Sequence, residues 1–400
     1  MDRKSISAFK MQLFAKPKFN EKVLCFFTTY SIIIYIIPQF FLKGIMTFMA
    51  NITYHKEEEI HNVELMRDIL YDLPKFVSRY FRSIEYSKAP RTRLGYARDI
   101  KSFFEFLCMT NPSLKGKSTA DVSIDIIRRI EPEDIEEYLD YLKVYTKDNR
   151  RYTNGERAVK RKLIALRGFF KYLYKNRQID SDPASIVDTP QIHDKAIVRM
   201  EVNEVAQFLD NVEYGNKLTD HQHAYHEKTK TRDLALLTLM LGTGIRVSEC
   251  VGLDIHDIDF DYDRIKVVRK GGYEAYVYFG QEAKEALLEY LDERKEIVTK
   301  DGHEDALFLS SQRRRISVRS VENMVKKYAQ ITTPLKKITP HKLRSTYGTS
   351  LYQQTSDIYL VADVLGHKDV NTTKKHYADI DEWQRMKAKD AVTLREKPGK

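Results

Sequence analysis

The chain has 400 residues and a formal net charge of +10. This length suits two or three domains with an ample hydrophobic core, and the surplus of lysine and arginine favours a polyanionic partner. The three cysteines, Cys25, Cys108 and Cys250, are widely spaced. Their spacing excludes a cysteine-rich zinc finger and a disulfide scaffold, and it indicates a reduced, cytoplasmic protein. The sequence has no Walker lysine loop and no glycine fingerprint of a dinucleotide site.

Residues 1–48 differ in composition from the rest of the chain. The stretch Val23–Leu42 carries no charged side chain and, at about twenty residues, is long enough to span a bilayer. Three interpretations are open, namely a membrane anchor, a signal sequence, or sequence upstream of the true start. Signal peptides end in small residues, which are not well placed here. Because Met49 opens a polar stretch that suits the start of a soluble protein, we favour the third interpretation.

Residues 60–180 are expected to form a four-helix domain. Apolar side chains recur at helical intervals in four segments, which are residues 57–81, 88–107, 132–145 and 154–174. The fourth segment also carries a cluster of cations, whose mutual repulsion an anionic partner would relieve. A merely solvated helix face is an equal alternative. The candidate DNA contacts in this segment are Arg157, Lys160, Arg161 and Arg167.

Residues 181–198 contain two prolines and no sustained period, which is typical of a linker between domains. We expect a second domain over residues 199–390. Its early stretch Tyr214–Lys230 is polar and holds three histidines, which are His221, His223 and His226. Because no cysteine lies nearby, we interpret them as exposed loop residues and expect no metal site.

A glycine break separates two predicted helices in the stretch Asp233–Leu253. The first helix is apolar, Gly242 and Gly244 follow it, and the second helix carries Arg246. Glu249 lies one turn after Arg246 on the same face, where its carboxylate can hold the guanidinium by a charge-assisted bond.

The stretch Arg264–Phe279 alternates on both sides of Lys270, which predicts a β-hairpin with this lysine at its tip. A lysine on a tight turn is a compact cation that can donate a proton. Further along, three cations precede a predicted helix, and they are Arg313, Arg314 and Arg315. Cations beside the N–H groups of a helix start suit a phosphate contact, and a solvated triplet is the alternative.

The most informative motif lies near the C-terminal end. His341 and Arg344 are three residues apart and share one face of a predicted helix. An apolar run then ends at Gly366, a residue type that terminates helices, so His367 lies at a helix end. Tyr377 is the only tyrosine after it. The residues near these histidines are basic, whereas an acyl-transfer or metal site would need acidic or thiol side chains there. Basic neighbours suit a phosphate group that is bound by positive charge and attacked by an oxygen nucleophile.

Six of these residues, in this order along the chain, resemble the tyrosine recombinase (phage integrase) family: Arg246, Lys270, His341, Arg344, His367 and Tyr377. The matching pieces are TGIRVSE, the lysine hairpin, HKLR, LGH and the terminal tyrosine. The resemblance covers about residues 70–379. Many members place the tyrosine nine residues after the LGH histidine, where this chain has His376, and we assign the nucleophile to Tyr377.

The resemblance implies a mainly α fold with a small antiparallel β-sheet. It implies a two-domain tyrosine recombinase architecture, with a helical core-binding domain and a mixed α/β catalytic domain that together clamp double-stranded DNA. It also implies a homotetramer acting on paired recombination sites, without a cofactor or a metal.

The resemblance further implies strand cleavage by transesterification. Tyr377 would attack the scissile phosphate, form a 3′-phosphotyrosyl bond and release a 5′-hydroxyl. The other five residues would divide the work: Arg246 and Arg344 hold the non-bridging oxygens, Lys270 protonates the leaving oxygen, His341 relays the tyrosine proton, and His367 hydrogen-bonds the phosphate.

Within the family, the opening LMRDILYDLPKFVSRYF and the linker VDTPQIHDKAIVRMEVNEVAQFLD resemble Xer-type recombinases that act alone to resolve chromosome dimers. An integrase of a mobile element or phage is the close rival. A catalytically silent DNA-binding regulator on the same fold is less favoured, because all six reactive residues are present. A membrane-anchored protein is supported by Val23–Leu42 alone.

Overall fold

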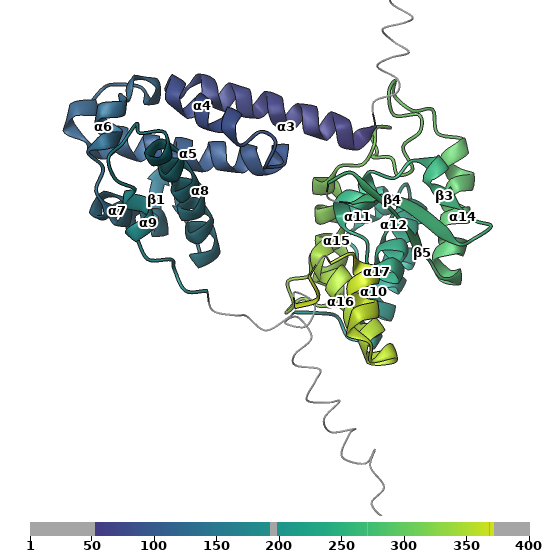
Figure 1. Cartoon of the computed structure of the whole chain (residues 1–400). Coiled ribbons are helices and arrows are strands. Elements are labelled where there is room, and N and C mark those ends of the chain that lie inside the picture. The colour runs from purple at the N-terminus through teal and green to yellow at the C-terminus, as the bar shows by residue number, and fades with distance from the viewer. Residues whose placement is uncertain (1–52, 193–197, 270, 368, 372–400) are drawn as a thin grey trace, which may run out of the picture. The chain divides into compact units, whose positions relative to one another are not determined.

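The computed structural model describes residues 53–192, 198–269, 271–367 and 369–371 (Figure 1). The hydrophobic stretch Val23–Leu42 and the residues Lys270 and Tyr377 lie outside these ranges. Within the ranges, no helix combines the length and the apolar character that crossing a membrane requires.

The first part of the chain is helical, as its amphipathic segments predict. Proline marks four of the α-helix starts in this part, and one of these helices begins at Pro183. Pro74 precedes one helix and divides the expected helix 57–81 in two, while Pro90 and Pro132 occupy the first turns of two others. The α-helices are α3 (Tyr54–Tyr71), α4 (Lys75–Ser83), α5 (Pro90–Thr110), α6 (Ile124–Arg128), α7 (Pro132–Lys143), α8 (Glu156–Lys175) and α9 (Pro183–Ile186). Single 3-10 turns at Pro112–Leu114 and Thr119–Asp121 lie between α5 and α6.

A β-hairpin joins α7 to α8, where the sequence predicts that the helix continues to residue 145. Strand β1 (Val144–Lys147) pairs antiparallel with β2 (Arg150–Thr153). The backbone angle φ is positive at both turn residues, 50° at Asp148 and 58° at Asn149. Positive φ at both central residues is what a two-residue type I′ turn requires.

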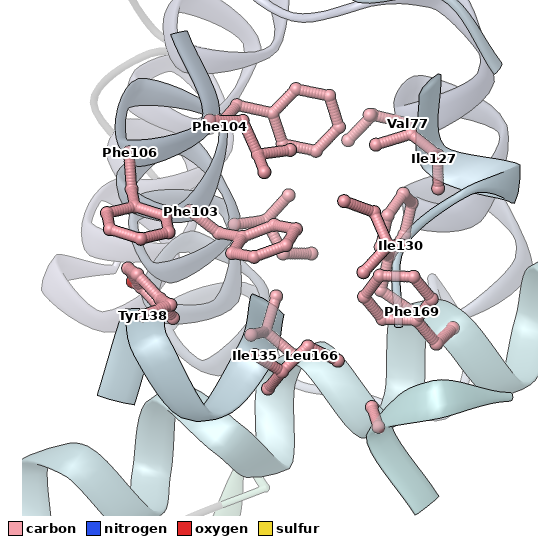
Figure 2. Packing of buried hydrophobic residues seen from close by; sticks show 14 of the residues in the cluster. Val77, Phe103, Phe104, Phe106, Ile127, Ile130, Ile135, Tyr138, Leu166 and Phe169 are labelled. Carbon is pink, nitrogen blue, oxygen red and sulfur yellow. The ribbon is translucent and has the colours of Figure 1, made fainter. Parts of the chain in front are cut away.

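An aromatic core holds this helical part together (Figure 2). The ring of Phe103, on α5, lies 5.1 Å from that of Tyr138 on α7 and 6.0 Å from that of Phe170 on α8, both edge-to-face. Phe104 meets Phe169 in the same manner at 6.1 Å. Such pairs contribute about 0.5–1.5 kcal/mol each beyond the burial of their surface. These edge-to-face ring contacts therefore fix α5 against α7 and α8.

The beginning of the expected linker belongs to this core. Ala184 and Val187 are buried in the same cluster. Arg167 of α8 donates from Nε to the Ala184 carbonyl at 3.0 Å, from Nη2 to the Val187 carbonyl at 2.5 Å, and from Nη1 to the Thr189 hydroxyl at 2.8 Å. One arginine thus ties the chain to α8 as far as residue 189.

The second part of the chain is mainly helical and contains one small sheet. Its strands β3 (Ile258–Asp259), β4 (Arg264–Arg269) and β5 (Tyr273–Tyr278) are antiparallel in that order, and Arg269 pairs with Tyr273 across the predicted hairpin. These findings confirm the predicted fold class. The helices are α10 (Val202–Tyr214), α11 (Asp220–His226), α12 (Lys230–Thr243), α13 (Val247–Val251), α14 (Gln281–Lys295), α15 (Val318–Thr332), α16 (Pro340–Thr355) and α17 (Ile358–Leu365), with a 3-10 turn at Ile255–Asp257.

Helix α12 is the buried centre of this part and packs against α10, α14 and α16. Its leucines Leu236, Leu237 and Leu239 are fully buried although they point in different directions around the helix. A helix that is apolar all round must be covered on every side. The position of α12 is therefore set by its neighbours along its whole length.

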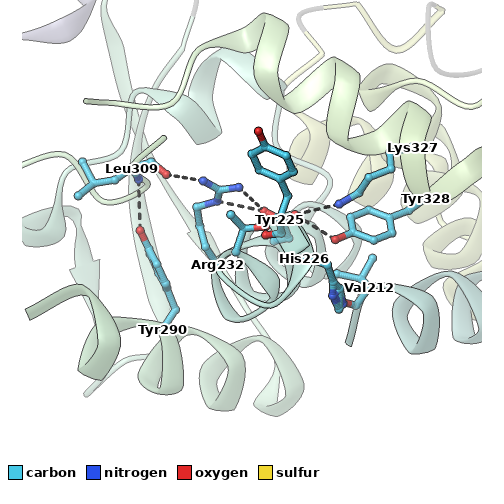
Figure 3. Close-up of polar contacts among 10 residues, drawn as sticks. Val212, Tyr225, His226, Arg232, Tyr290, Leu309, Lys327 and Tyr328 are labelled. Carbon is cyan, nitrogen blue, oxygen red and sulfur yellow. Dashed lines mark hydrogen bonds and ion pairs between the residues drawn. The ribbon is translucent and has the colours of Figure 1, made fainter. Parts of the chain in front are cut away.

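A buried carboxylate anchors the N-terminal end of α12 (Figure 3). Asp233 accepts a hydrogen bond from Arg232 Nε at 3.0 Å and from the Tyr328 hydroxyl at 3.0 Å, and Lys327 Nζ lies 3.7 Å from it. Arg232 also donates to the Leu309 carbonyl at 2.8 Å. An unpaired buried carboxylate is costly. These contacts therefore hold α12 both to α15 and to the segment around Leu309, which precedes α15 in the chain.

The expectation of exposed histidines in a loop is wrong for His226. The segment forms helix α11, and His226 is fully buried at its end. Its Nε2 lies 3.2 Å from the Val212 carbonyl and so carries the proton, while Nδ1 has no hydrogen-bond partner within the described ranges. Burial, followed by the positive charge of Lys327, lowers the pKa of His226.

We predict that protonation of His226 destabilises the fold below about pH 6.5, the ordinary pKa of histidine. The unfolded chain binds this proton at that ordinary pKa, whereas the folded chain binds it only at lower pH. The unfolded state therefore holds more protons in between, and the free energy of unfolding rises with pH there. Urea unfolding between about pH 5 and 8 measures this slope.

The variant His226→Gln should show a smaller slope than the unmodified chain. His221→Gln changes an exposed histidine of the same helix and should keep the slope. Equal slopes in the chain and in His226→Gln would contradict the assignment.

Candidate active site

The C-terminal end of α12 leads into the first predicted site residue. The helix ends at Thr243, Gly244 follows with a left-handed φ of 65°, and Arg246 is the N-cap of α13. Glu249 is buried, and its two oxygens accept from the Arg246 backbone N–H at 2.8 Å and from Arg246 Nη1 at 2.7 Å. The contact that the spacing of Arg246 and Glu249 predicts is present, and this charge-assisted hydrogen bond holds the Arg246 guanidinium in place.

Arg344 lies on the second turn of α16 and is buried, with 4% of its surface exposed. Its Nη1 donates to the Gly244 carbonyl at 2.6 Å, and its Nη2 donates to the Leu365 carbonyl. A buried guanidinium needs such acceptors because it cannot lose its charge. These two bonds join the glycine break after α12 to the end of α17.

The end of α17 is the point where three arginines converge. Arg269, the last residue of β4, donates to the carbonyls of Val364 at 3.0 Å and Asp363 at 3.5 Å. Arg344 occupies the Leu365 carbonyl, and Arg246 Nη2 lies 3.4 Å from the Gly366 carbonyl. The last carbonyls of a helix have no partners within the helix and lie at the negative end of its dipole. Four successive carbonyls are thus capped by three cations.

Gly366 permits this close approach. Its φ is 63°, in the left-handed region, and a Cβ at this position would collide with the Arg269 guanidinium. A glycine avoids both the backbone strain and the collision. Helix α17 therefore ends with its last carbonyls open to the three guanidinium groups. His367 is the next residue after Gly366.

The two histidines flank this arrangement. His367 is half-buried, and its backbone N–H donates to the Ala362 carbonyl at 2.8 Å, which fixes the chain immediately after α17. His341 is exposed on the first turn of α16, one turn before Arg344. The structure thus brings together the segments that carry Arg246, Arg344 and His367. Lys270 and Tyr377 lie outside the described residues.

Arg269 is the contributor that the sequence did not indicate. The sequence pattern singles out the following residue, Lys270, as the cation of the hairpin, and nothing in that pattern distinguishes Arg269. Its role depends on carbonyls more than ninety residues later in the chain.

The candidate DNA contacts fall into two groups by their surroundings. The first group is exposed or half-exposed and has no ion pair within the described residues, and it comprises Arg157, Lys160, Arg313 and Arg314. The second group has partners inside the protein. Arg161 donates to Asp99 through two bonds at 2.5 and 2.8 Å, and Arg315 donates to the carbonyls of Val251 and Leu253 at 3.1 and 2.8 Å.

Arg167 belongs to the second group because it holds residues 184–189, as described above. Among the described residues, no group of three histidine, cysteine, aspartate or glutamate side chains is placed to bind a metal ion.

Two family models match the chain. The N-terminal SAM-like domain of phage integrases matches residues 77–177, and the phage integrase family model matches residues 199–383. Tyrosine recombinase XerS of Streptococcus agalactiae serotype III is 31% identical over 356 residues, which cover 82% of this chain and 98% of that protein.

Solved structures share the fold at low sequence identity. XerH site-specific recombinase bound to its difH substrate superimposes with a TM-score of 0.51 at 20% identity, covering 72% of this chain and 76% of that one. The Tn1549 transposon integrase in complex with a circular intermediate DNA gives a TM-score of 0.56 at 18% identity, covering 78% of this chain and 99% of that one.

We predict that Gly244→Ala lowers the melting temperature. A Cβ here would collide with the Tyr347 ring and lie 2.9 Å from Leu365 Cδ2, and φ is left-handed. The backbone strain alone costs about 1–2 kcal/mol, and each kcal/mol lowers the melting temperature by about 2–4 °C in a domain of this size.

Gly242→Ala is the matched control, because a Cβ there meets nothing within 4 Å. Gly242 lies within α12, where alanine is the better helix former, so its melting temperature should stay or rise. A similar loss in both variants would show that the packing around Gly244 is not as described.

Proposed function

Since the chain belongs to the phage integrase family of tyrosine recombinases, we propose that it cuts and rejoins duplex DNA at specific sites through a phosphotyrosyl bond on Tyr377. The observation that carries this proposal is the convergence of Arg246 and Arg344 on the end of α17, directly before His367. Two fixed guanidinium groups at a helix end that a histidine follows directly in the chain suit a phosphate whose negative charge increases during reaction.

Preorganisation of the two arginines is the main catalytic contribution that we assign to the fold. Glu249 and the carbonyls of Gly244, Leu365 and Gly366 keep the guanidinium groups in place before DNA arrives. Donors that are already oriented need no reorganisation when charge develops in the transition state. Removing one such donor typically costs about 2.7–4 kcal/mol of transition-state stabilisation.

The chemistry is a transesterification in each direction. The Tyr377 oxygen attacks phosphorus, its proton passes to His341, and the 5′ oxygen leaves with a proton from Lys270. Rejoining is the reverse, in which a 5′-hydroxyl attacks the phosphotyrosyl bond and tyrosine leaves. The covalent bond conserves the energy of the phosphodiester, so rejoining needs no nucleotide cofactor.

We assign the biological role to resolution of chromosome dimers, in the cytoplasm and by a homotetramer on paired sites. The support is the match to tyrosine recombinase XerS over 98% of that protein's length. Integration of a mobile element is the second candidate, which the fold shared with the Tn1549 transposon integrase favours. We place a DNA-binding domain at residues 60–180 and a catalytic domain at residues 199–390, in keeping with the two matched family models.

The nucleophile can be tested with a nicked suicide substrate, built from the site that the protein selects out of host genomic DNA. Loss of the small nicked fragment prevents rejoining and traps the covalent adduct, which denaturing electrophoresis displays. Tyr377→Phe should abolish the adduct and keep DNA binding, because the substitution removes one oxygen and retains the ring.

Tyr359→Phe is the control. Tyr359 is exposed on α17, with 71% of its surface accessible, and this variant should trap DNA as the unmodified chain does. An adduct that persists in Tyr377→Phe would place the attacking residue elsewhere.

A further inference from the structure

The β1–β2 hairpin is held firmly against the helical part that carries it. At its base, Asn154 Nδ2 donates to the Leu142 carbonyl at 2.9 Å and so caps the end of α7. Along its length, the Tyr145 ring lies 5.3 Å from that of Tyr141 on α7 and stacks on that of Tyr152 at 5.4 Å. The type I′ turn fixes the register of the two strands. These contacts attach the hairpin to the end of α7, and we call it the arm.

The cations of this arm and of the start of α8 form two sets, according to whether they have a carboxylate partner. One set is neutralised by carboxylates and consists of Lys143 with Asp140, Lys147 with Glu105, and Arg161 and Lys162 with Asp99. The other set has no ion pair among the residues that the structure describes, and it consists of Arg150, Arg151, Arg157 and Lys160. The unpaired cations thus concentrate at β2 and on the first turns of α8.

Arg150 and Arg151 point to opposite faces of the arm, because successive residues of a strand alternate. Arg150 pairs with Lys147 across the strands, and Arg151 pairs with Thr146. Two cations directly opposite each other destabilise a hairpin. Glu105 binds Lys147 at 2.8 Å, whereas Arg150 has no ion pair among the described residues. The arm keeps a charge arrangement that a polyanion would stabilise.

We propose that the β1–β2 hairpin enters the major groove of duplex DNA as a second DNA-binding element beside α8. A two-stranded ribbon fits this groove, which is about 12 Å wide. Arg150 and Arg151, on opposite faces, then reach the phosphates on the two sides of the groove. Arg157 and Lys160, which lie three residues apart on one helix face, continue the contact along the backbone, because α8 begins only three residues after β2 ends.

This inference rests on the proposed function and names the DNA-contacting element. Contacts to phosphates release counterions, so the logarithm of the binding constant falls with the logarithm of salt concentration by about 0.9 per contact. Fluorescence anisotropy with a short duplex of random sequence, measured over a range of salt concentrations, reports this slope for the full chain.

Arg150→Gln and Arg151→Gln should each reduce the slope by about one, and the double variant by about two. The control Lys143→Gln removes an exposed cation of the same region that is paired with Asp140, and its slope should equal that of the unmodified chain. Thermal melting of each variant checks that the fold is retained.

An unchanged slope in the double variant, with DNA binding intact in the unmodified chain, would overturn the hairpin as a DNA contact. The proposal would also be overturned if Lys143→Gln reduced the slope as much as the arginine variants do. If the unmodified chain failed to bind duplex DNA at all, the proposed function itself would be wrong, which is a separate outcome.

Discussion

The C-terminal end of α17 is the constraint on which the site depends. Its last carbonyls need donors, and three guanidinium groups from distant parts of the sequence supply them: Arg246 from the start of α13, Arg269 from the end of β4, and Arg344 from α16. Each contact satisfies a polar group that would otherwise be unpaired at the negative end of a helix. The same contacts fix the positions of the two arginines to which we assign phosphate binding.

The rest of this part of the chain positions that helix end. Helix α12 is held at its beginning by the donors around Asp233 and leads at its end to Gly244, whose carbonyl accepts from Arg344. A displacement of α12 would therefore move an acceptor of Arg344 and the backbone of Arg246 together. The buried leucines along the helix oppose such a displacement.

Sequence patterns predicted the features that depend on neighbours along the chain. The contact between Arg246 and Glu249 follows from their spacing of three residues, and the strands around Lys270 follow from alternation and a glycine turn. The β1–β2 hairpin was missed because the apolar period of α7 continues into it, and its Asp148-Asn149 turn lacks the glycine that usually marks such turns.

Features that depend on distant contacts could not be predicted. The burial of His226 arises from packing against Val212 and Tyr328, and a histidine in a polar segment gives no sign of it. Most intramolecular partners of Arg167 and Arg315 are backbone carbonyls, which every residue possesses, so the pattern of side chains does not reveal them. The remaining partners are the Thr189 hydroxyl and the Asp254 carboxylate, which are also distant in the sequence. The capping of α17 could not be predicted for the same reason, because its acceptors are also backbone carbonyls.

The most direct test of this account is the single-turnover cleavage rate of Arg269→Gln on the suicide substrate, measured together with its affinity for DNA. Arg319→Gln, which changes an exposed arginine paired with Glu322, is the control. If the end of α17 positions the catalytic groups, Arg269→Gln should bind DNA normally and cleave about tenfold to a hundredfold more slowly, as expected for small displacements of reacting groups. A cleavage rate equal to that of the unmodified chain and of Arg319→Gln would contradict it.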